Sequence, residues 1–225
     1  MKKVIAVAGH SGAGKTTCSG FLAETLGADH IHADVYLKQT PFLCPEIYEK
    51  IYRQKPDLKD VTKTIDIIKS GSHEHEKEYI SLVLPTINSL LQKDYQDFKK
   101  NDKSFLLLDW IDIAITDLWK TADYKVLVCS SRENRHKALD KRQRKNGYFD
   151  ESIGARRDIA HRDAVRHAEN TSNVILFNNY NETFFEHIKT ISEGMFKGKS
   201  PAKLTQFLSG TEKKIIDEIH LDGSF

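Results

Sequence analysis

The chain has 225 residues, with 34 Lys and Arg against 32 Asp and Glu, a formal net charge of +2 and 39% hydrophobic residues. This composition excludes a disordered or fibrous chain, and the near balance of charge gives no global case for binding nucleic acid or an anionic membrane. No apolar run reaches the ~20 residues of a membrane span, and the N-terminus lacks a signal-peptide cleavage site, so we expect a cytoplasmic protein. Three cysteines without CxxC spacing indicate free buried thiols.

The first 45 residues are predicted to form a strand, a glycine loop, a helix, a second strand and another loop. The apolar run Val4–Ala8 predicts a strand that stops at a glycine, and Lys15–Thr25 predicts a helix that ends just before another glycine. The run Ala28–Asp34 predicts a short strand with the aspartate at its carboxyl end. A loop containing Pro41 and Pro45 is expected to follow.

Residues from about 46 to 100 are predicted to be helical. Apolar residues recur there at spacings of three and four, which defines one buried stripe. The stripe consists of Ile80, Val83, Leu84, Ile87, Leu90, Leu91, Tyr95 and Phe98. We interpret residues 40–100 as a helical insertion.

Strands and helices alternate again in the second half. Phe105–Asp109 and Tyr124–Cys129 are continuous apolar runs, as expected for parallel strands buried on both faces. The stretch Arg132–Arg166 has 11 Lys or Arg against 6 acids and favours helices. A strand at Asn173–Phe177 and a helix at Glu182–Ser192 close the pattern.

This alternation implies right-handed crossovers and a mostly parallel sheet between two layers of helices. We expect an α/β fold in which residues 1–225 form a single domain, because the length is only about one and a half times the ~150-residue prior for a domain. The tail at 194–225 receives no structural prediction.

The segment from Gly9 to Thr16 reads GHSGAGKT and matches the pattern GxxxxGK[ST] between a predicted strand and a predicted helix. Glycines let backbone N–H groups turn toward phosphate oxygens, Lys15 reaches the β- and γ-phosphates, and the Thr16 hydroxyl can bind Mg²⁺. The sequence therefore predicts a P-loop that binds Mg²⁺ and ATP. The residues expected to contact the nucleotide are Gly9, Ser11, Gly12, Ala13, Gly14, Lys15, Thr16 and Thr17.

Other P-loop classes fit less well. A guanine-nucleotide switch needs an Asn-Lys-x-Asp base reader, and the last strand is followed instead by Asn178-Asn179-Tyr180-Asn181. Motor and helicase ATPases usually need longer chains. A kinase of a small molecule or nucleotide remains.

Kinase chemistry needs a carboxylate near the acceptor hydroxyl and another near the metal. Asp34, Asp109 and Asp112 end or follow predicted strands, where ligands collect in such sheets. Asp34 is the candidate base, and Asp109 is a candidate Mg²⁺ ligand. A turn or capping role is the alternative for each, and it is the favoured reading of Asp112.

The basic stretch, about 132–170, is predicted to form a lid whose arginines stabilise phosphate charge. Its candidates are Arg142, Arg156, Arg157, Arg162 and Arg166. The alternative is a solvated helix with Asp158 and Arg162 as an i,i+4 pair.

The histidines do not predict a metal site. Neither HxxH nor HExxH spacing occurs with a carboxylate partner, and no third ligand is evident for His30, His32, His73 or His75. The side chains of His10 and Ser11 occupy variable P-loop positions and need no role.

With these motifs in place, most of residues 3–190 resembles the dephospho-coenzyme A kinases. The resemblance rests on AGHSGAGKTT, on IHADVYLKQ, on LLLDWIDIAITDLWKTADYKVLV, and on the stretch from ENRHKALDKRQ to VILFNN. It implies that Asp34 is the catalytic base, that Arg142 is a lid arginine, and that Asn178 or Asn179 lies near the adenine. It also implies a place in coenzyme A biosynthesis.

The chain departs from this family on the acceptor side. His32 replaces the first Asp of the family motif, Trp110 to Ala114 replace a Pro-Leu-Leu-Phe-Glu segment, and residues 40–100 show no match to the coenzyme-binding helices. A kinase of a nucleoside, a riboside or another small metabolite therefore remains an alternative, as does a nucleotide-sensing module without catalysis.

Overall fold

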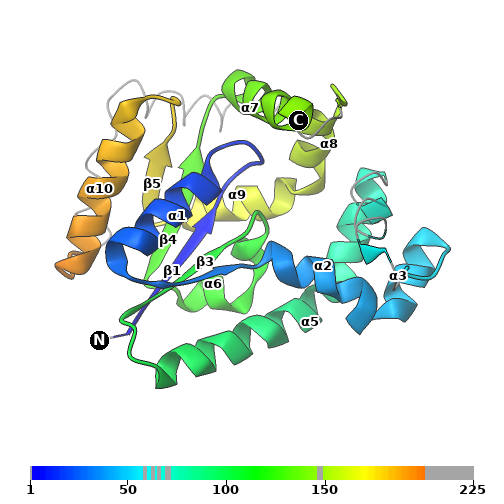
Figure 1. The fold of residues 1–225 in the computed structure, drawn as a ribbon, viewed down its shortest axis with the longest axis horizontal. Coiled ribbons are helices and arrows are strands. Elements are labelled where there is room, and N and C mark those ends of the chain that lie inside the picture. The colour runs from blue at the N-terminus through cyan, green and yellow to red at the C-terminus, as the bar shows by residue number, and fades with distance from the viewer. Residues whose placement is uncertain are drawn as a thin grey trace.

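The computed structural model describes residues 2–57, 60–61, 64, 67–68, 72–145 and 149–200. The strands are β1 (Lys3–Ala8), β2 (Asp29–His32), β3 (Phe105–Asp109), β4 (Tyr124–Cys129) and β5 (Val174–Phe177). The helices are α1 (Lys15–Leu26), α2 (Asp34–Leu43), α3 (Pro45–Tyr52), α5 (His73–Lys100), α6 (Asp117–Thr121), α7 (Arg132–Lys145), α8 (Ile153–Ala160), α9 (Arg162–Thr171) and α10 (Glu182–Phe196), with a 3₁₀ turn, η1, at Ile113–Ile115. The strands form one sheet in the order β2-β3-β1-β4-β5, and every neighbouring pair is parallel (Figure 1).

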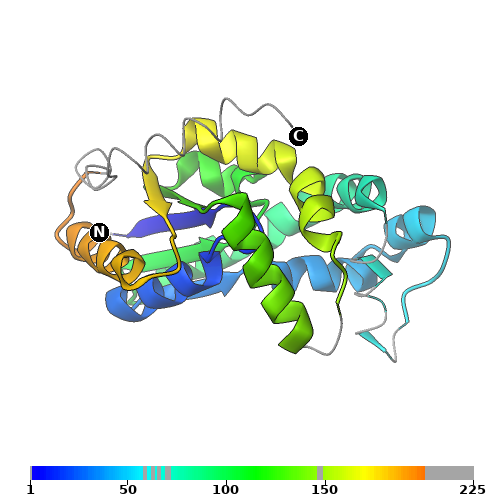
Figure 2. The same ribbon diagram turned by 90° about the horizontal axis from the view of Figure 1, so that it is seen from above.

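The central strand β1 buries both of its faces. Val4, Ala6 and Ala8 belong to a core shared with α5, α6 and α9, whereas Ile5 and Val7 belong to a second core shared with α1 and α10. Successive strand residues point to opposite faces, so a continuous apolar run supplies both cores. Helices thus cover both faces of the sheet (Figure 2), which confirms the predicted three-layer α/β fold.

The predicted strands are all present, but the end of the second one was wrong. β2 ends at His32, and Asp34 is the first residue of α2 instead of the last residue of a strand. Ala33 already has helical dihedral angles, φ −66° and ψ −13°. A carboxylate in the first helical turn is stabilised by the helix dipole, which favours the earlier helix start.

The predicted loop around the two prolines was also wrong, because both prolines lie in helices. Pro41 is inside α2, where it cannot donate a backbone N–H to the carbonyl of Leu37. The hydroxyl of Thr40 donates to that carbonyl instead, at 2.7 Å. Pro45 is the first residue of α3, a position that tolerates proline because its N–H would have no helical partner.

The long helix α5 confirms the predicted apolar stripe. Its start is capped by Ser72, whose hydroxyl accepts a hydrogen bond from the backbone N–H of His75 at 3.2 Å. The fully buried members of the stripe are Ile80, Val83, Ile87, Leu91 and Phe98. The stripe packs on the sheet core, and α2 and α3 pack against the same helix.

The basic stretch forms α7, α8 and α9, and the closing helix α10 runs four residues beyond its predicted end. The tail from residue 201 onward lies outside the described residues. Cys18, Cys44 and Cys129 are free and buried, as predicted. Among the described helices, none is both long enough and apolar enough to cross a membrane.

Candidate active site

The loop between β1 and α1 adopts a conformation that only glycine permits at three positions. Gly9, Gly12 and Gly14 have φ of 140°, 79° and 98°. A Cβ at Gly9 would lie 2.2 Å from the carbonyl oxygen of Val128, and one at Gly14 would lie 2.4 Å from Nδ2 of Asn178. The predicted P-loop therefore packs tightly on the ends of β4 and β5 while it turns into α1.

Asn178 and Tyr180, which follow β5, hold the backbone of this loop by hydrogen bonds. The side-chain amide of Asn178 donates to the carbonyl of Ala13 at 2.9 Å, and its oxygen accepts from the backbone N–H of Tyr180 at 2.7 Å. The Tyr180 hydroxyl donates to the carbonyl of Gly12. The structure thus places Asn178 under the loop, where its side chain fixes the loop backbone.

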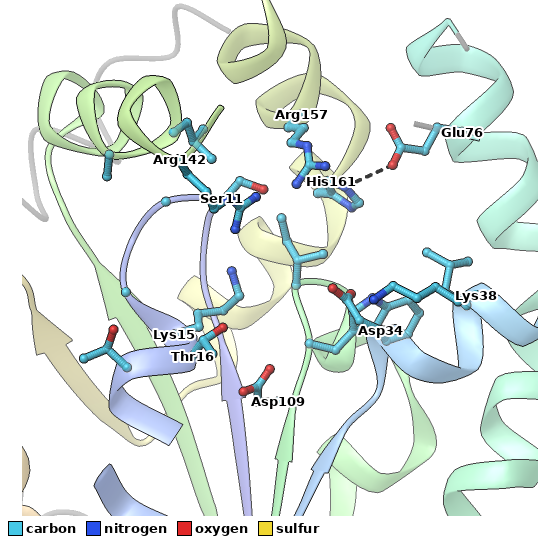
Figure 3. Close-up of a pocket in the computed structure, with 18 of the residues that line it drawn as sticks. Ser11, Lys15, Thr16, Asp34, Lys38, Glu76, Asp109, Arg142, Arg157 and His161 are labelled. Atoms are coloured by element: carbon cyan, nitrogen blue, oxygen red, sulfur yellow. Dashed lines mark ion pairs between the residues drawn. The ribbon is translucent and has the colours of Figure 1, made fainter. Parts of the chain in front are cut away.

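Lys15 begins α1 and points over the loop (Figure 3). Its ammonium donates to the carbonyl of His10 at 2.9 Å. Burial lowers the pKa of Lys15 to about 8, and the carboxylates of Asp34, Asp109 and Asp112 oppose that shift. The side chain is therefore mostly protonated at neutral pH, as phosphate binding requires.

The loop opens into a cavity of about 320 Å³. It is lined by P-loop residues, by α2, by the first turns of α5, by the residues after β3, and by α7 and α8. Of the predicted site residues it contains Ser11, Gly12, Gly14, Lys15, Thr16, Thr17, Asp34, Asp109 and Arg142. Gly9, Ala13, Asn178 and Asn179 are not among its lining residues.

Asp109 and Asp34 line this cavity from the end of β3 and the start of α2. Asp109 ends β3 and is buried, and Figure 3 shows its carboxylate below Thr16 and Lys15. Asp34 is exposed at the start of α2, and Figure 3 shows it next to Lys38. The sheet order brings these side chains together because β3 lies between β2 and β1.

Arginines reach the cavity from the helices above it. Arg142 of α7 and Arg157 of α8 both line it, and Figure 3 shows them over the P-loop. Sequence reasoning included Arg157 among the lid candidates and gave Arg142 the leading role.

A buried ion pair behind the loop was not predicted. Both guanidinium nitrogens of Arg135 donate to Asp158, at 2.7 and 3.1 Å, and NH1 also contacts the carbonyl of Ser11 at 3.4 Å. Nδ1 of His10 lies 3.3 Å from the same carboxylate. Burial alone would raise the pKa of Asp158, but His10 and Arg135 hold it well below its usual range. The His10 side chain thus lies against this pair, a contact that the sequence did not indicate.

Sequence reasoning also missed a buried histidine on the acceptor side of the cavity. Nδ1 of His161 lies 2.8 and 2.9 Å from the two carboxylate oxygens of Asp112, and Nε2 lies 3.7 Å from Glu76. Burial would lower the pKa of His161, but Asp112 and Glu76 outweigh it and raise the pKa. Asp112 thus pairs with His161, a partner 49 residues away that no local pattern indicates.

The expectation that His30 and His32 lack a third ligand was wrong as well. Both lie within hydrogen-bond distance of the Asp109 carboxylate, because β2 pairs with β3 in parallel and places His32 opposite Asp109. His30 and Asp109 are 79 positions apart in the chain, so their spacing in the sequence could not reveal the contact.

Comparison with known proteins establishes the fold. No family model matches the chain, and no curated protein matches its sequence. Among solved structures, TT1252 from Thermus thermophilus is similar, with a TM-score of 0.59 and 16% identity over 92% of this chain and 99% of that one. Dephospho-CoA kinase from Campylobacter jejuni (TM-score 0.51, 16% identity, 88% and 99% covered) and shikimate kinase from Acinetobacter baumannii (0.50, 15%, 88% and 96%) are similar too. The chain therefore shares the fold of these P-loop kinases, with a five-stranded parallel sheet in the order β2-β3-β1-β4-β5.

Proposed function

We propose that this protein is an ATP-dependent kinase that phosphorylates a hydroxyl group of a small molecule. The observation that carries the proposal is one continuous cavity with a P-loop at one end and Asp34, Lys38, Glu76 and His161 at the other. A donor phosphate held at Lys15 would thus face an acceptor held among ionisable side chains.

Each step of phosphoryl transfer has a candidate residue. The acceptor hydroxyl oxygen attacks the γ-phosphorus of ATP, the bond between that phosphorus and the β–γ bridging oxygen breaks, and ADP leaves. Asp34 takes the hydroxyl proton. Lys15, Arg142 and Arg157 stabilise the negative charge on the transferring group.

The residues present also fit a magnesium ion. The hydroxyl of Thr16 and the carboxylate of Asp109 are oxygen ligands on the same side of the cavity, and Mg²⁺ prefers such ligands. Bound there, Mg²⁺ would neutralise phosphate charge.

We infer that dephospho-coenzyme A is the first acceptor to test, because the motif resemblance favours it. A nucleoside, a riboside or another small alcohol is the alternative, because residues 40–100 show no coenzyme-binding pattern. Apolar side chains of Leu37, Trp110 and Ile111 also line the cavity, so the acceptor is expected to carry an apolar or ring face beside its hydroxyl.

ADP formation with Mg²⁺ and ATP, measured with dephospho-coenzyme A and then with a panel of nucleosides and small alcohols, tests the proposal. Lys15→Ala should abolish turnover, and Asp34→Asn should lower kcat by about 10²–10⁴-fold with ATP affinity nearly unchanged. Lys50→Ala, an exposed lysine of α3 that is not among the cavity-lining residues, is the matched control. Full turnover by Lys15→Ala would overturn the proposal, and ATP binding without turnover on any acceptor would favour a nucleotide sensor.

A further inference from the structure

Three side chains of metal-binding type meet at the carboxyl end of the edge strand β2. Nε2 of His30 lies 3.3 Å from Oδ2 of Asp109, and Nδ1 of His32 lies 3.0 Å from the same oxygen. The three ligand atoms all lie within 4.8 Å of one another.

The backbone explains why they converge. His30 and His32 are two residues apart on a strand, so their side chains point to the same face of the sheet. The parallel register pairs His32 with Asp109 and His30 with Leu107, the residue two positions before Asp109. All three side chains therefore share the face that α1 covers, because Leu107 packs in the core with α1.

We propose that His30, His32 and Asp109 bind a divalent transition-metal ion, with Zn²⁺ as the best-fitting ion. Metal–ligand bonds of about 2.0–2.2 Å at tetrahedral angles separate neighbouring ligand atoms by about 3.3–3.5 Å, and the two histidine–carboxylate distances lie at or just below that range. Two imidazoles and a carboxylate suit zinc, cobalt, nickel or copper, whereas magnesium and calcium prefer oxygen ligands alone. Three protein ligands leave a tetrahedral ion one further position.

The exposure of the three groups suits a metal that enters from solvent. Asp109 is buried and His30 is partly buried. The side chain of His32 is 50% exposed at the sheet edge, which gives an ion a path from solvent.

This ion would lie beside the proposed magnesium site without replacing it. Both histidines contact Oδ2 of Asp109. One carboxylate could then hold a transition metal through one oxygen and face the phosphate site with the other. Binding of the metal itself does not depend on the proposed kinase activity.

The test is a titration of metal-free protein with Co²⁺. Binding is measured by the visible absorption that Co²⁺ shows when protein ligands hold it in tetrahedral geometry, and Zn²⁺ is then added as a competitor. The wild type should bind one equivalent. His30→Ala and His32→Ala should each weaken binding by at least about 100-fold, because removal of a direct ligand costs more than removal of the residues that support ligands. His167→Ala, which removes an exposed histidine of α9, should bind like the wild type.

Circular dichroism checks that each variant is folded. His32→Ala is the most informative variant, because His32 is exposed and its replacement should disturb the fold least. A wild-type protein without the absorption band would overturn the proposal. So would His30→Ala and His32→Ala variants that retain wild-type affinity, since the metal would then lie elsewhere. A wild type that binds one Co²⁺ but transfers no phosphate would uphold this site and count against the kinase alone.

Discussion

Loss of the buried charge pair behind the P-loop should destabilise the protein and weaken nucleotide binding together. Arg135 and Asp158 are 3% and 2% exposed in their side chains and form two parallel hydrogen bonds. Asp158→Asn keeps the shape of the side chain but leaves the guanidinium buried without its counter-charge. Breaking such a pair costs about 3–5 kcal/mol, because the remaining charge stays out of water.

For a chain of this size, about 2–4 °C of melting temperature corresponds to 1 kcal/mol, so Asp158→Asn should lower Tm by about 6–20 °C. Differential scanning calorimetry or a dye-based thermal melt measures this shift. Glu133→Gln is the matched control, because it removes an ion pair of the same helix, with Lys137, that is exposed to solvent. The Tm of Glu133→Gln should equal that of the wild type, because exposed ion pairs contribute little to stability.

The same substitution should raise the Kd for an ATP analogue. Arg135 contacts the carbonyl of Ser11, and a Cβ at Gly12 would lie 2.5 Å from the backbone oxygen of Arg135, so α7 packs directly on the loop. Displacement of the arginine would disturb the loop backbone that is proposed to bind phosphate. An unchanged Tm together with unchanged analogue affinity in Asp158→Asn would refute this reasoning.

Two further predictions concern the loop and the acceptor side. Gly14→Ala should lose binding of an ATP analogue and unfold at lower temperature, because the new Cβ would lie 2.4 Å from Asn178 and φ at this position is 98°. Gly20 lies in an open and exposed helical position, so the free energy of unfolding of Gly20→Ala should instead rise by about 1 kcal/mol. His161 has a raised pKa, so its stabilising pairing with Asp112 is complete below the ordinary pKa of 6.5 and is lost as the pH rises through the raised value. Urea unfolding from pH 6 to 9 should therefore show a falling difference between wild type and His161→Gln, and a constant or rising difference would contradict this account.

Signals within short stretches of sequence explain why the strands and the P-loop could be predicted. The strands follow from apolar runs such as Phe105–Asp109, and the P-loop follows from eight consecutive positions with flanking elements that match. These signals need no knowledge of distant residues. The wrong prediction of a loop at Pro41 also has a local cause. Proline leaves the carbonyl of Leu37 without a backbone donor, but the Thr40 hydroxyl donates to that carbonyl and the helix continues.

Contacts between distant segments explain what could not be predicted. The pairs Arg135–Asp158, Asp112–His161 and His30–Asp109 join residues 23, 49 and 79 positions apart. Alternating strands and helices imply a parallel sheet but leave the strand order open. His30 and His32 lie beside Asp109 because β2 and β3 are neighbours in the observed order.

This order also accounts for the different roles proposed for the carboxylates of the site. Asp34 starts a helix at the exposed edge of the cavity, where a substrate can reach it. Asp109 ends an interior strand and is buried, so it needs permanent partners, which His30 and His32 supply. An exposed carboxylate is free to exchange a proton with an acceptor, whereas a buried and paired one stays ionised and suits a metal ion. This difference in exposure and pairing supports Asp34, rather than Asp109, as the proposed base.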